Sequence, residues 1–346
     1  MSQAATHTVR FEPIGLEMEV EEGETVLDAA FRQGISLPHG CKEGQCGSCK
    51  AKIAEGDFEL LKYSTFALPD YESEAGSVLL CRTHVYGDIT VDLLNYDEEL
   101  LSRAIVVKSI PGRVAGITSL TTDIRVVAID VEQPLRFWAG QFVELTIPDR
   151  GVMRAYSMAN PPSTGGRLEF IIKTYANGAF SALLDGGLSI GDVVLVKGPY
   201  GTCFRREGRL GPMLLIGGGS GMSPLWSILH DHIASGERRP VRFFYGARTE
   251  ADLFYRDELA AASARIPDFR FVPALSHATE GSAWTGETGF IHDVVQRHLD
   301  EERLAGDIDA YACGPTPMID AVIPILQRNG VEPEHIHFDK FTPAVR

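Results

Sequence analysis

The sequence lacks the features of a membrane-spanning or exported protein. In its 346 residues, no apolar run approaches the roughly 18 residues that a membrane-spanning helix needs. The first ten residues, Met1–Arg10, have no apolar stretch after a basic cluster, so no secretory signal is visible. The sequence also has no internal repeat and no low-complexity segment. We therefore expect a globular, cytoplasmic protein that does not enter a membrane.

Basic residues are scarce. The chain has 32 Lys and Arg against 47 Asp and Glu, which gives a formal net charge of −15. Residues 1–100 hold 19 acidic and 7 basic residues, so they carry −12 of that charge. An acidic N-terminal third argues against nucleic acid as a partner. It suits docking to a basic patch on another protein, although such acidity also simply keeps a protein soluble.

The length, 346 residues and 37.8 kDa, is more than one compact domain usually holds, and we expect three domains. Residues 1–101 and 102–208 are predicted to be rich in strands. Residues 209–346 are predicted to form an α/β domain. The fold class is therefore multidomain, with α+β and α/β parts.

Each domain is predicted from its own hydrophobic pattern. Alternation in the first predicts a hairpin, a short helix and a closing strand. Short strands separated by turn signals in the second favour an antiparallel barrel. Strand-like runs alternating with helical segments in the third favour a parallel sheet. The expected elements are strands at Thr8–Phe11, Leu16–Val20, Ile89–Leu93, Ile124–Val131, Gln141–Ile147, Leu168–Thr174, Val193–Lys197, Met213–Ile216, Val241–Tyr245, Phe269–Leu275, Ala310–Cys313 and His335–Phe338, and a helix at Val26–Gln33.

Four of the six cysteines lie within the first 81 residues, at Cys41, Cys46, Cys49 and Cys81. The spacing C-x4-C-x2-C, followed after 31 residues by a fourth cysteine, is typical of a plant-type [2Fe-2S] site. Glycines in this loop would let it wrap closely and direct main-chain N–H groups at the sulfurs. A zinc site is the alternative, but zinc motifs usually contain two C-x2-C pairs. Cys203 is expected to be a small buried hydrophobe.

The second domain contains a candidate flavin site. Arg154, Tyr156 and Ser157 end an expected strand and offer a cation for a diphosphate, an aromatic face and a hydrogen-bond donor. Lys173 and the segment Gly178–Ser181 follow, and the segment presents main-chain N–H groups and a hydroxyl at a helix start. An exposed Arg beside a barrel-wall Tyr would give the same short pattern by chance.

The third domain contains a candidate nucleotide site. A strand runs into a glycine-rich turn and then a helix, which is the geometry that holds a pyrophosphate. We expect Ser223 to cap that helix and Pro224 to suit its first turn. A purely structural glycine loop is the alternative. The residues expected at the nucleotide are Gly217, Gly218, Gly219, Ser220, Gly221, Arg248, Cys313, Gly314 and Pro315.

The residues after the second strand of this domain bear on the choice of nucleotide. Glu250 and Asp252 would repel a 2′-phosphate, which favours NADH over NADPH. Arg248 argues the other way, because an arginine can accommodate that phosphate.

Together these motifs resemble the reductase components of bacterial multicomponent oxygenases along essentially the whole chain. The resemblance rests on the four cysteines, Arg154–Ser157, Gly217–Pro224, Cys313–Pro315 and Phe338–Phe341. It implies a β-grasp plant-type ferredoxin domain, an FAD-binding barrel and an NAD-binding domain. Segments such as Ala54–Asp57 and Gly198–Gly201 look most like the reductases of soluble di-iron monooxygenases.

The resemblance also implies a role for each motif. Arg154 would bind the FAD pyrophosphate, Tyr156 would pack on the flavin ring and Ser157 would hydrogen-bond near its N5. Lys173, Gly178 and Ser181 would hold the ribityl chain and phosphate. The glycine turn would bind the NADH pyrophosphate, Arg248 the adenosine side, and Cys313 would lie near the nicotinamide. Phe341, rather than Phe338, would cover the flavin.

The implied reaction is hydride transfer from NADH to FAD, followed by single-electron transfer through the cluster to the hydroxylase component of a monooxygenase. The acidic ferredoxin domain would dock on that partner. Three alternatives stay open: the reductase of a ring-hydroxylating dioxygenase, a non-catalytic redox sensor, and a self-sufficient NADH oxidase.

Overall fold

The computed structural model describes residues 5–94, 96, 101, 103, 105–164, 166–278, 283–302, 304 and 306–341. The chain divides into two compact units. The first is Met1–Val107 with Tyr200–Thr202, and the second is Lys108–Pro199 with Cys203–Arg346. The predicted domain boundary after residue 101 falls at residue 102, which lies outside the described residues.

The first unit is a mixed sheet with a helix packed on it. The strand order is β2-β1-β7-β3-β5, in which β1 is antiparallel to β2 and parallel to β7. Strands β4 and β6 form a separate two-stranded sheet. The predicted hairpin, helix and closing strand are all confirmed. The elements are β1 Thr6–Glu12, β2 Leu16–Glu21, α1 Val26–Arg32, β3 Lys50–Glu55, β4 Phe58–Leu60, α2 Asp70–Glu74, β5 Ser77–Leu79, β6 Thr83–Val85 and β7 Ile89–Leu93.

Helix α1 begins directly after a side-chain cap, Thr25. The Thr25 hydroxyl accepts a hydrogen bond from the Asp28 main-chain N–H at 3.1 Å, which satisfies one of the free donors of the first turn. Leu27, Ala30 and Phe31 are buried along the helix. Burying a leucine or phenylalanine contributes roughly 1.5–3 kcal/mol, so packing on the sheet holds this short helix.

The first half of the second unit is a six-stranded antiparallel barrel with the order β11-β10-β13-β8-β9-β12. A bridge between Met158 and Phe170 joins the end of β11 to β12 and closes the barrel. Strand β8 was not predicted, because Pro111 and Gly112 interrupt its pattern. The elements are β8 Lys108–Ser119, β9 Ile124–Val131, β10 Phe142–Ile147, β11 Val152–Ser157, β12 Arg167–Lys173, α4 Ala179–Ala182 and β13 Val193–Tyr200.

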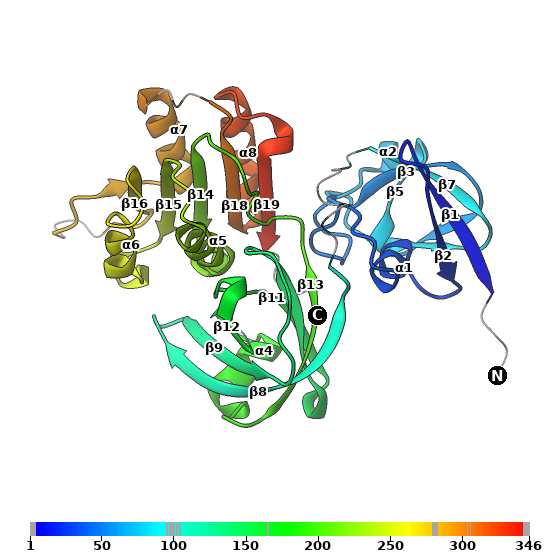
Figure 1. Cartoon of the computed structure of the whole chain (residues 1–346), viewed down its shortest axis with the longest axis horizontal. Helices are drawn as coiled ribbons and strands as arrows, with labels where there is room; N and C mark the ends of the chain where they lie inside the picture. Colours follow the sequence, from blue (N-terminus) through cyan, green and yellow to red (C-terminus); the bar gives the residue numbers. More distant parts are fainter. Residues whose placement is uncertain are drawn as a thin grey trace. The chain divides into compact units, whose positions relative to one another are not determined.

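The second half of this unit is a parallel sheet with the order β17-β16-β15-β14-β18-β19, and Figure 1 shows this order from β16 to β19. All five strand pairs are parallel, as the alternation of strands and helices predicts. The elements are β14 Met213–Gly218, α5 Met222–Ser235, β15 Val241–Ala247, α6 Arg256–Ala262, β16 Phe269–Leu275, β17 Glu287–Thr288, α7 Ile291–Glu302, β18 Asp309–Pro315, α8 Thr316–Arg328 and β19 Ile336–Phe341.

Helices cover both faces of this sheet, and successive residues of β14 serve the two faces. Leu215 belongs to a core cluster that includes Leu225 of α5 and Leu259 of α6. Leu214 belongs to a second cluster with residues of α7 and α8, among them Val294. Because β14 pairs with β15 on one side and β18 on the other, the strand order reverses there. Open α/β sheets bind ligands outside the carboxyl end of such a strand.

The predicted fold class is therefore confirmed, with a mixed sheet, an antiparallel barrel and a parallel α/β sheet in chain order. In the described part of the chain, no helix has the length and apolar character of a membrane span.

Candidate functional site

The cysteine loop of the first unit directs main-chain N–H groups at its sulfurs. The Cys46 sulfur accepts from the N–H of Cys41 at 3.3 Å. The Cys41 sulfur accepts from the N–H groups of Glu43 at 3.4 Å and Gln45 at 3.3 Å. Such donors stabilise negative charge on sulfur, so the loop is built for thiolates rather than for a hydrophobic core.

Glycines allow this loop to turn so tightly. Gly44 and Gly47 have φ values of 69° and 76°, which side chains rarely adopt. A Cβ on Gly47 would lie 3.0 Å from the Ala67 carbonyl oxygen, and one on Gly40 would lie 3.0 Å from the Cys46 sulfur. The expected close wrapping is therefore confirmed.

The four thiols form two hydrogen-bonded pairs. The sulfurs of Cys49 and Cys81 lie 3.3 Å apart, and Cys41 donates to Cys46. This bond lowers the pKa of Cys46 to about 5, and the hydrogen bond between Cys49 and Cys81 lowers the pKa of Cys49. Among the described residues, no group of three or more His, Cys, Asp or Glu side chains surrounds a single metal position. Two pairs fit a two-iron cluster, whose four thiolates divide between its irons.

The predicted flavin strand is β11. Arg154 and Tyr156 are half-buried, and Ser157 is buried at the end of the strand. Burial raises the pKa of the Tyr156 phenol, whose ring packs 4.9 Å from that of Phe180 in α4. The Arg154 guanidinium donates to the Met153 carbonyl oxygen at 2.7 Å. Arg154 and Tyr156 are two positions apart on one strand, so the cation and the aromatic ring lie on the same face of it, as the flavin interpretation requires.

The other flavin candidates come from the end of β12 and the turn that follows it. The Lys173 ammonium lies 3.1 Å from a carboxylate oxygen of Asp123. The Ser181 hydroxyl accepts from the Tyr175 main-chain N–H at 2.9 Å, and its own proton stays available to a phosphate. A Cβ on Gly178 would lie 2.7 Å from the Ser181 hydroxyl oxygen, so the turn needs a glycine at this position.

The glycine-rich turn lies at the carboxyl end of β14, where the strand order reverses. A Cβ on Gly221 would lie 1.9 Å from the Cys313 carbonyl oxygen, and one on Gly217 would lie 2.6 Å from the Leu225 side chain. Gly219 has a φ of 58°, and its carbonyl oxygen accepts from the buried Tyr245 hydroxyl at 2.8 Å. The turn therefore needs glycine for close packing between strands as well as for its own conformation.

The prediction that Ser223 caps α5 is wrong. The helix begins at Met222, and no side chain caps it. The Ser223 hydroxyl instead donates to the Ser157 carbonyl oxygen at 2.7 Å and accepts from the Ile171 N–H at 3.2 Å. A residue expected to serve its own helix thus holds the glycine-rich turn against the flavin strand.

The Cys313–Pro315 segment ends β18, beside the glycine-rich turn. Gly314 has a φ of 152°, and a Cβ there would lie 2.8 Å from the Met318 methyl carbon. The Cys313 thiol is fully buried, with its sulfur 3.7 Å from that of Cys203. Burial raises the pKa of Cys313. In this structure the main chain of Cys313, and not its thiol, borders the glycine-rich turn; Cys203 is buried as predicted.

The remaining candidates lie at the ends of β15 and β19. Arg248 follows β15 and pairs with Asp123 at 3.1 Å and Asp252 at 3.5 Å. Phe341 is half-buried at the end of β19, opposite Pro315 in the strand register. Phe338 is half-buried as well and packs against the core cluster beneath α7 and α8.

Three family models match the chain in the order that the fold displays. They are the 2Fe-2S iron-sulfur cluster binding domain over residues 9–86, the oxidoreductase FAD-binding domain over 111–204 and the oxidoreductase NAD-binding domain over 215–323. Each spans the motif assigned to its cofactor. The four thiols, the cation–aromatic strand and the glycine-rich turn fit a [2Fe-2S] cluster, FAD and NADH respectively.

Full-length relatives identify the family. The reductase component of propane 2-monooxygenase from Gordonia sp. (strain TY-5) is 45% identical over 344 residues, which cover 98% of each chain. The chain belongs to the reductase components of multicomponent oxygenases. The electron transfer component of anthranilate 1,2-dioxygenase from Acinetobacter baylyi is 34% identical over 333 residues, which cover 93% of the present chain and 92% of that relative. A crystal structure of a cytochrome P450 reductase from Amycolatopsis has 31% identity and a TM-score of 0.86, over 98% of the reductase and 100% of that chain.

The family fixes the general activity. The reductase is an NADH-dependent flavoprotein with an iron–sulfur domain, and it transfers electrons to an oxygenase partner. The predicted cofactors and enzyme class are confirmed.

Two residues at the site were missed from the sequence. Asp123 lies in the turn between β8 and β9, where an acid is ordinary turn chemistry. The side-chain oxygen of Asn160 accepts from the Glu169 N–H at 2.6 Å, and its main-chain carbonyl oxygen accepts from the hydroxyl of Ser227 in α5. Neither has a local signal for the site, because the contacts that join them to its other half lie far away in the sequence, 125 residues from Asp123 to Arg248 and 67 from Asn160 to Ser227.

Proposed function

We propose that the reductase supplies single electrons to the di-iron hydroxylase of a soluble monooxygenase that oxidises short alkanes, propane among them. The observation that carries this proposal is the 45% identity to a propane 2-monooxygenase reductase over 98% of both chains. A relative from a ring dioxygenase system is 34% identical, so that partner is the second candidate.

When bound, NADH supplies a hydride, FAD changes two-electron transfer into two one-electron transfers, and the cluster passes on single electrons. The protein supplies positions and charges. Cys41, Cys46, Cys49 and Cys81 ligate the cluster. The glycine-rich turn binds the nucleotide pyrophosphate on main-chain N–H groups. The flavin residues are Arg154 for the pyrophosphate, Tyr156 for the ring, Ser157 near N5, and Lys173, Gly178 and Ser181 for the ribityl and phosphate side.

The nicotinamide side is formed by Cys313, Gly314 and Pro315, with Phe341 over the flavin. Phe341 is the last residue of its strand, whereas Phe338 packs against the core cluster beneath α7 and α8, and this difference supports the choice of Phe341. Arg248 lies on the adenosine side, and the acids beside it favour NADH over NADPH. The three domains span residues 1–101, 102–208 and 209–346, and the free thiols Cys203 and Cys313 suit the reducing cytoplasm.

The acidic first unit docks on the hydroxylase, and Phe66 anchors that contact. Phe66 is 98% exposed, whereas the next residues, Ala67 and Leu68, are buried. The Ala67 carbonyl oxygen packs on Gly47 of the cysteine loop, so Phe66 directly precedes a residue that contacts this loop. Exposed aromatic residues of this kind are frequent energetic centres of interfaces.

The experiment compares electron delivery to two purified partners, a propane-type di-iron hydroxylase and a ring dioxygenase. Faster reduction of the hydroxylase, weakened by salt as charge-steered docking requires, supports the proposal. Phe66→Ala should reduce partner turnover about tenfold, since a central aromatic contributes on the order of 1–2 kcal/mol, without changing ferricyanide reduction. Leu210→Ala, at a site 87% exposed on the second unit, is the control. Faster delivery to the dioxygenase would reverse the assignment.

A further inference from the structure

One carboxylate lies between two cations beside the glycine-rich turn. The Oδ2 atom of Asp123 is 3.1 Å from the Lys173 ammonium and 3.1 Å from the Arg248 guanidinium. Lys173 ends strand β12 of the barrel, and Arg248 follows strand β15 of the parallel sheet. Asp123 therefore reaches from the barrel to a side chain of the nucleotide-binding part within the same unit.

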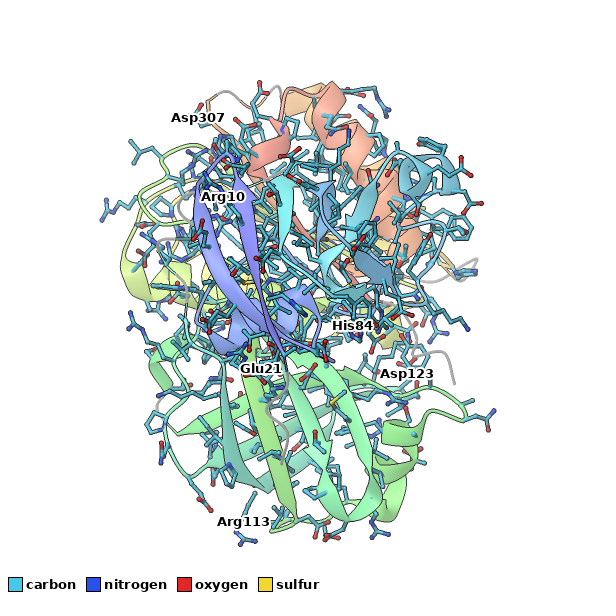
Figure 2. The ribbon with its side chains drawn as sticks, turned by 90° about the vertical axis from the view of Figure 1, so that its right-hand side faces the viewer. Arg10, Glu21, His84, Arg113, Asp123 and Asp307 are labelled. Carbon is cyan, nitrogen blue, oxygen red and sulfur yellow. The ribbon has the colours of Figure 1, made fainter. Side chains whose placement is uncertain are left out.

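The barrel holds Asp123 firmly in this position. The other carboxylate oxygen accepts from the Thr121 hydroxyl at 3.2 Å, and the Asp123 carbonyl oxygen accepts from the Thr174 N–H at 2.8 Å. In Figure 2, Asp123 lies at the end of the barrel opposite Arg113. Burial raises the pKa of Asp123 and the hydrogen bond from Lys173 lowers it; the net shift is downward. The carboxylate is thus charged at neutral pH.

The charged group formed by Asp123, Lys173 and Arg248 borders the nucleotide site on its adenosine side. A Cβ on Gly219 would lie 3.7 Å from the Lys173 side chain, so Lys173 covers the glycine-rich turn. A dinucleotide whose pyrophosphate lies on the turn after β14 extends its adenosine ribose toward the next strand, which here is β15. Arg248 therefore stands where a 2′-hydroxyl or a 2′-phosphate would lie.

The charges at this position cancel. Asp252 lies 3.5 Å from the same Arg248 nitrogen that contacts Asp123. Two carboxylates thus offset the charges of Lys173 and Arg248. An arginine recruits the 2′-phosphate of NADPH only when its charge is available, and a phosphate brings about two negative charges of its own. A group of side chains with no net charge accepts the 2′-hydroxyl of NADH and does not attract the 2′-phosphate of NADPH.

We propose that Asp123 is a specificity residue that discriminates against NADPH by neutralising Arg248 from the barrel side. Sequence motifs for nucleotide choice lie in the dinucleotide-binding domain itself, whereas this determinant comes from the flavin barrel. The proposal rests on the nucleotide site proposed above, with Arg248 on its adenosine side.

The test measures binding of two adenine nucleotides that carry no nicotinamide, 2′,5′-ADP and 5′-AMP, to the FAD-loaded protein by isothermal titration calorimetry. Asp123→Asn should raise the affinity ratio of 2′,5′-ADP to 5′-AMP about five- to tenfold, the size of one partly screened charge contact. The turnover ratio of NADPH to NADH should rise in parallel. Asp123→Ser, which also suits a turn, gives the same test if the asparagine variant folds poorly.

Two further variants make the test specific. Asp130→Asn removes another carboxylate of the barrel, one that pairs with Arg167 between strands β9 and β12. It should leave the affinity ratio of 2′,5′-ADP to 5′-AMP unchanged. Adding Arg248→Gln to Asp123→Asn should abolish the gain. An unchanged ratio in Asp123→Asn, or a gain that survives loss of Arg248, overturns the proposal. A wild-type protein that binds neither nucleotide contradicts the nucleotide site itself, and the proposal with it.

Discussion

The hydroxyl of Ser223 donates a 2.7 Å hydrogen bond to the carbonyl oxygen of Ser157. Ser223 lies in the first turn of α5, directly after the glycine-rich turn, and Ser157 ends the flavin strand β11. The same hydroxyl accepts from the Ile171 N–H of β12 at 3.2 Å. One buried side chain thus fixes the nucleotide turn relative to two strands of the barrel.

Ser223→Ala should therefore weaken the contact that aligns the barrel with the parallel-sheet half of the second unit. It leaves a buried N–H and a buried carbonyl without their partner, which costs roughly 1–3 kcal/mol of unfolding free energy. We also expect slower flavin reduction at saturating NADH, because hydride transfer depends on close placement of the two rings. Denaturant unfolding and stopped-flow absorbance measure the two effects.

Ser235→Ala is the matched control for this prediction, since its hydroxyl bonds only locally, to the His232 carbonyl oxygen and to the Glu237 N–H just after α5. It should change the flavin reduction rate little. Equal loss of rate in both variants would mean that the Ser223 contact has no special role in alignment.

Gly221→Ala should disrupt the nucleotide turn. The new methyl group would lie 1.9 Å from the main-chain oxygen of Cys313, so β18 and the turn must separate. Overpacking of this kind typically costs about 1–3 kcal/mol. We expect the KM for NADH to rise at least tenfold while flavin content stays close to that of the wild type. Steady-state ferricyanide reduction measures this.

Gly116→Ala provides the comparison, because a Cβ at Gly116 would meet no atom within 4 Å. Its kinetics should match those of the wild type. If Gly221→Ala also keeps the wild-type KM, the nucleotide does not lie on this turn.

The buried His39 should make the first unit less stable at acidic pH. Its Nδ1 contacts the Leu37 carbonyl oxygen at 2.7 Å, and its Nε2 accepts from the Gly201 N–H at 2.7 Å, so the ring is neutral. Burial lowers the pKa of His39 to about 4, below its value of about 6.5 in the unfolded chain. The native state therefore loses stability as the pH falls from about 6.5 toward 4, by up to roughly 3 kcal/mol.

The measurement is the unfolding free energy between pH 7 and pH 4, compared with that of His39→Gln. Other buried histidines, such as His232, have lowered pKa values as well, so the difference between the two curves isolates His39. The variant should have the shallower curve. Parallel curves would show that His39 is not the neutral, buried group described above.

Local patterns predicted most of the fold, and long-range contacts account for what they missed. Alternating residues predicted β9 with the bounds of the structure, whereas Pro111 and Gly112 concealed β8. The cysteine spacing predicted which four thiols would lie together, because a metal loop is a local motif, and the structure pairs Cys41 with Cys46 and Cys49 with Cys81. The contacts of Ser223 with Ile171 and of Asp123 with Arg248 span 52 and 125 residues, and no window of sequence contains both ends of such a contact.

The most direct test of the central claim is an anaerobic titration with NADH, followed by optical and electron paramagnetic resonance spectra. We expect NADH to bleach the flavin and to produce the rhombic signal of a reduced [2Fe-2S] cluster. Cys46→Ser should keep the bleaching and lose the signal. Bleaching without a cluster signal in wild-type protein that contains two irons per chain would contradict an internal path from NADH to the cluster.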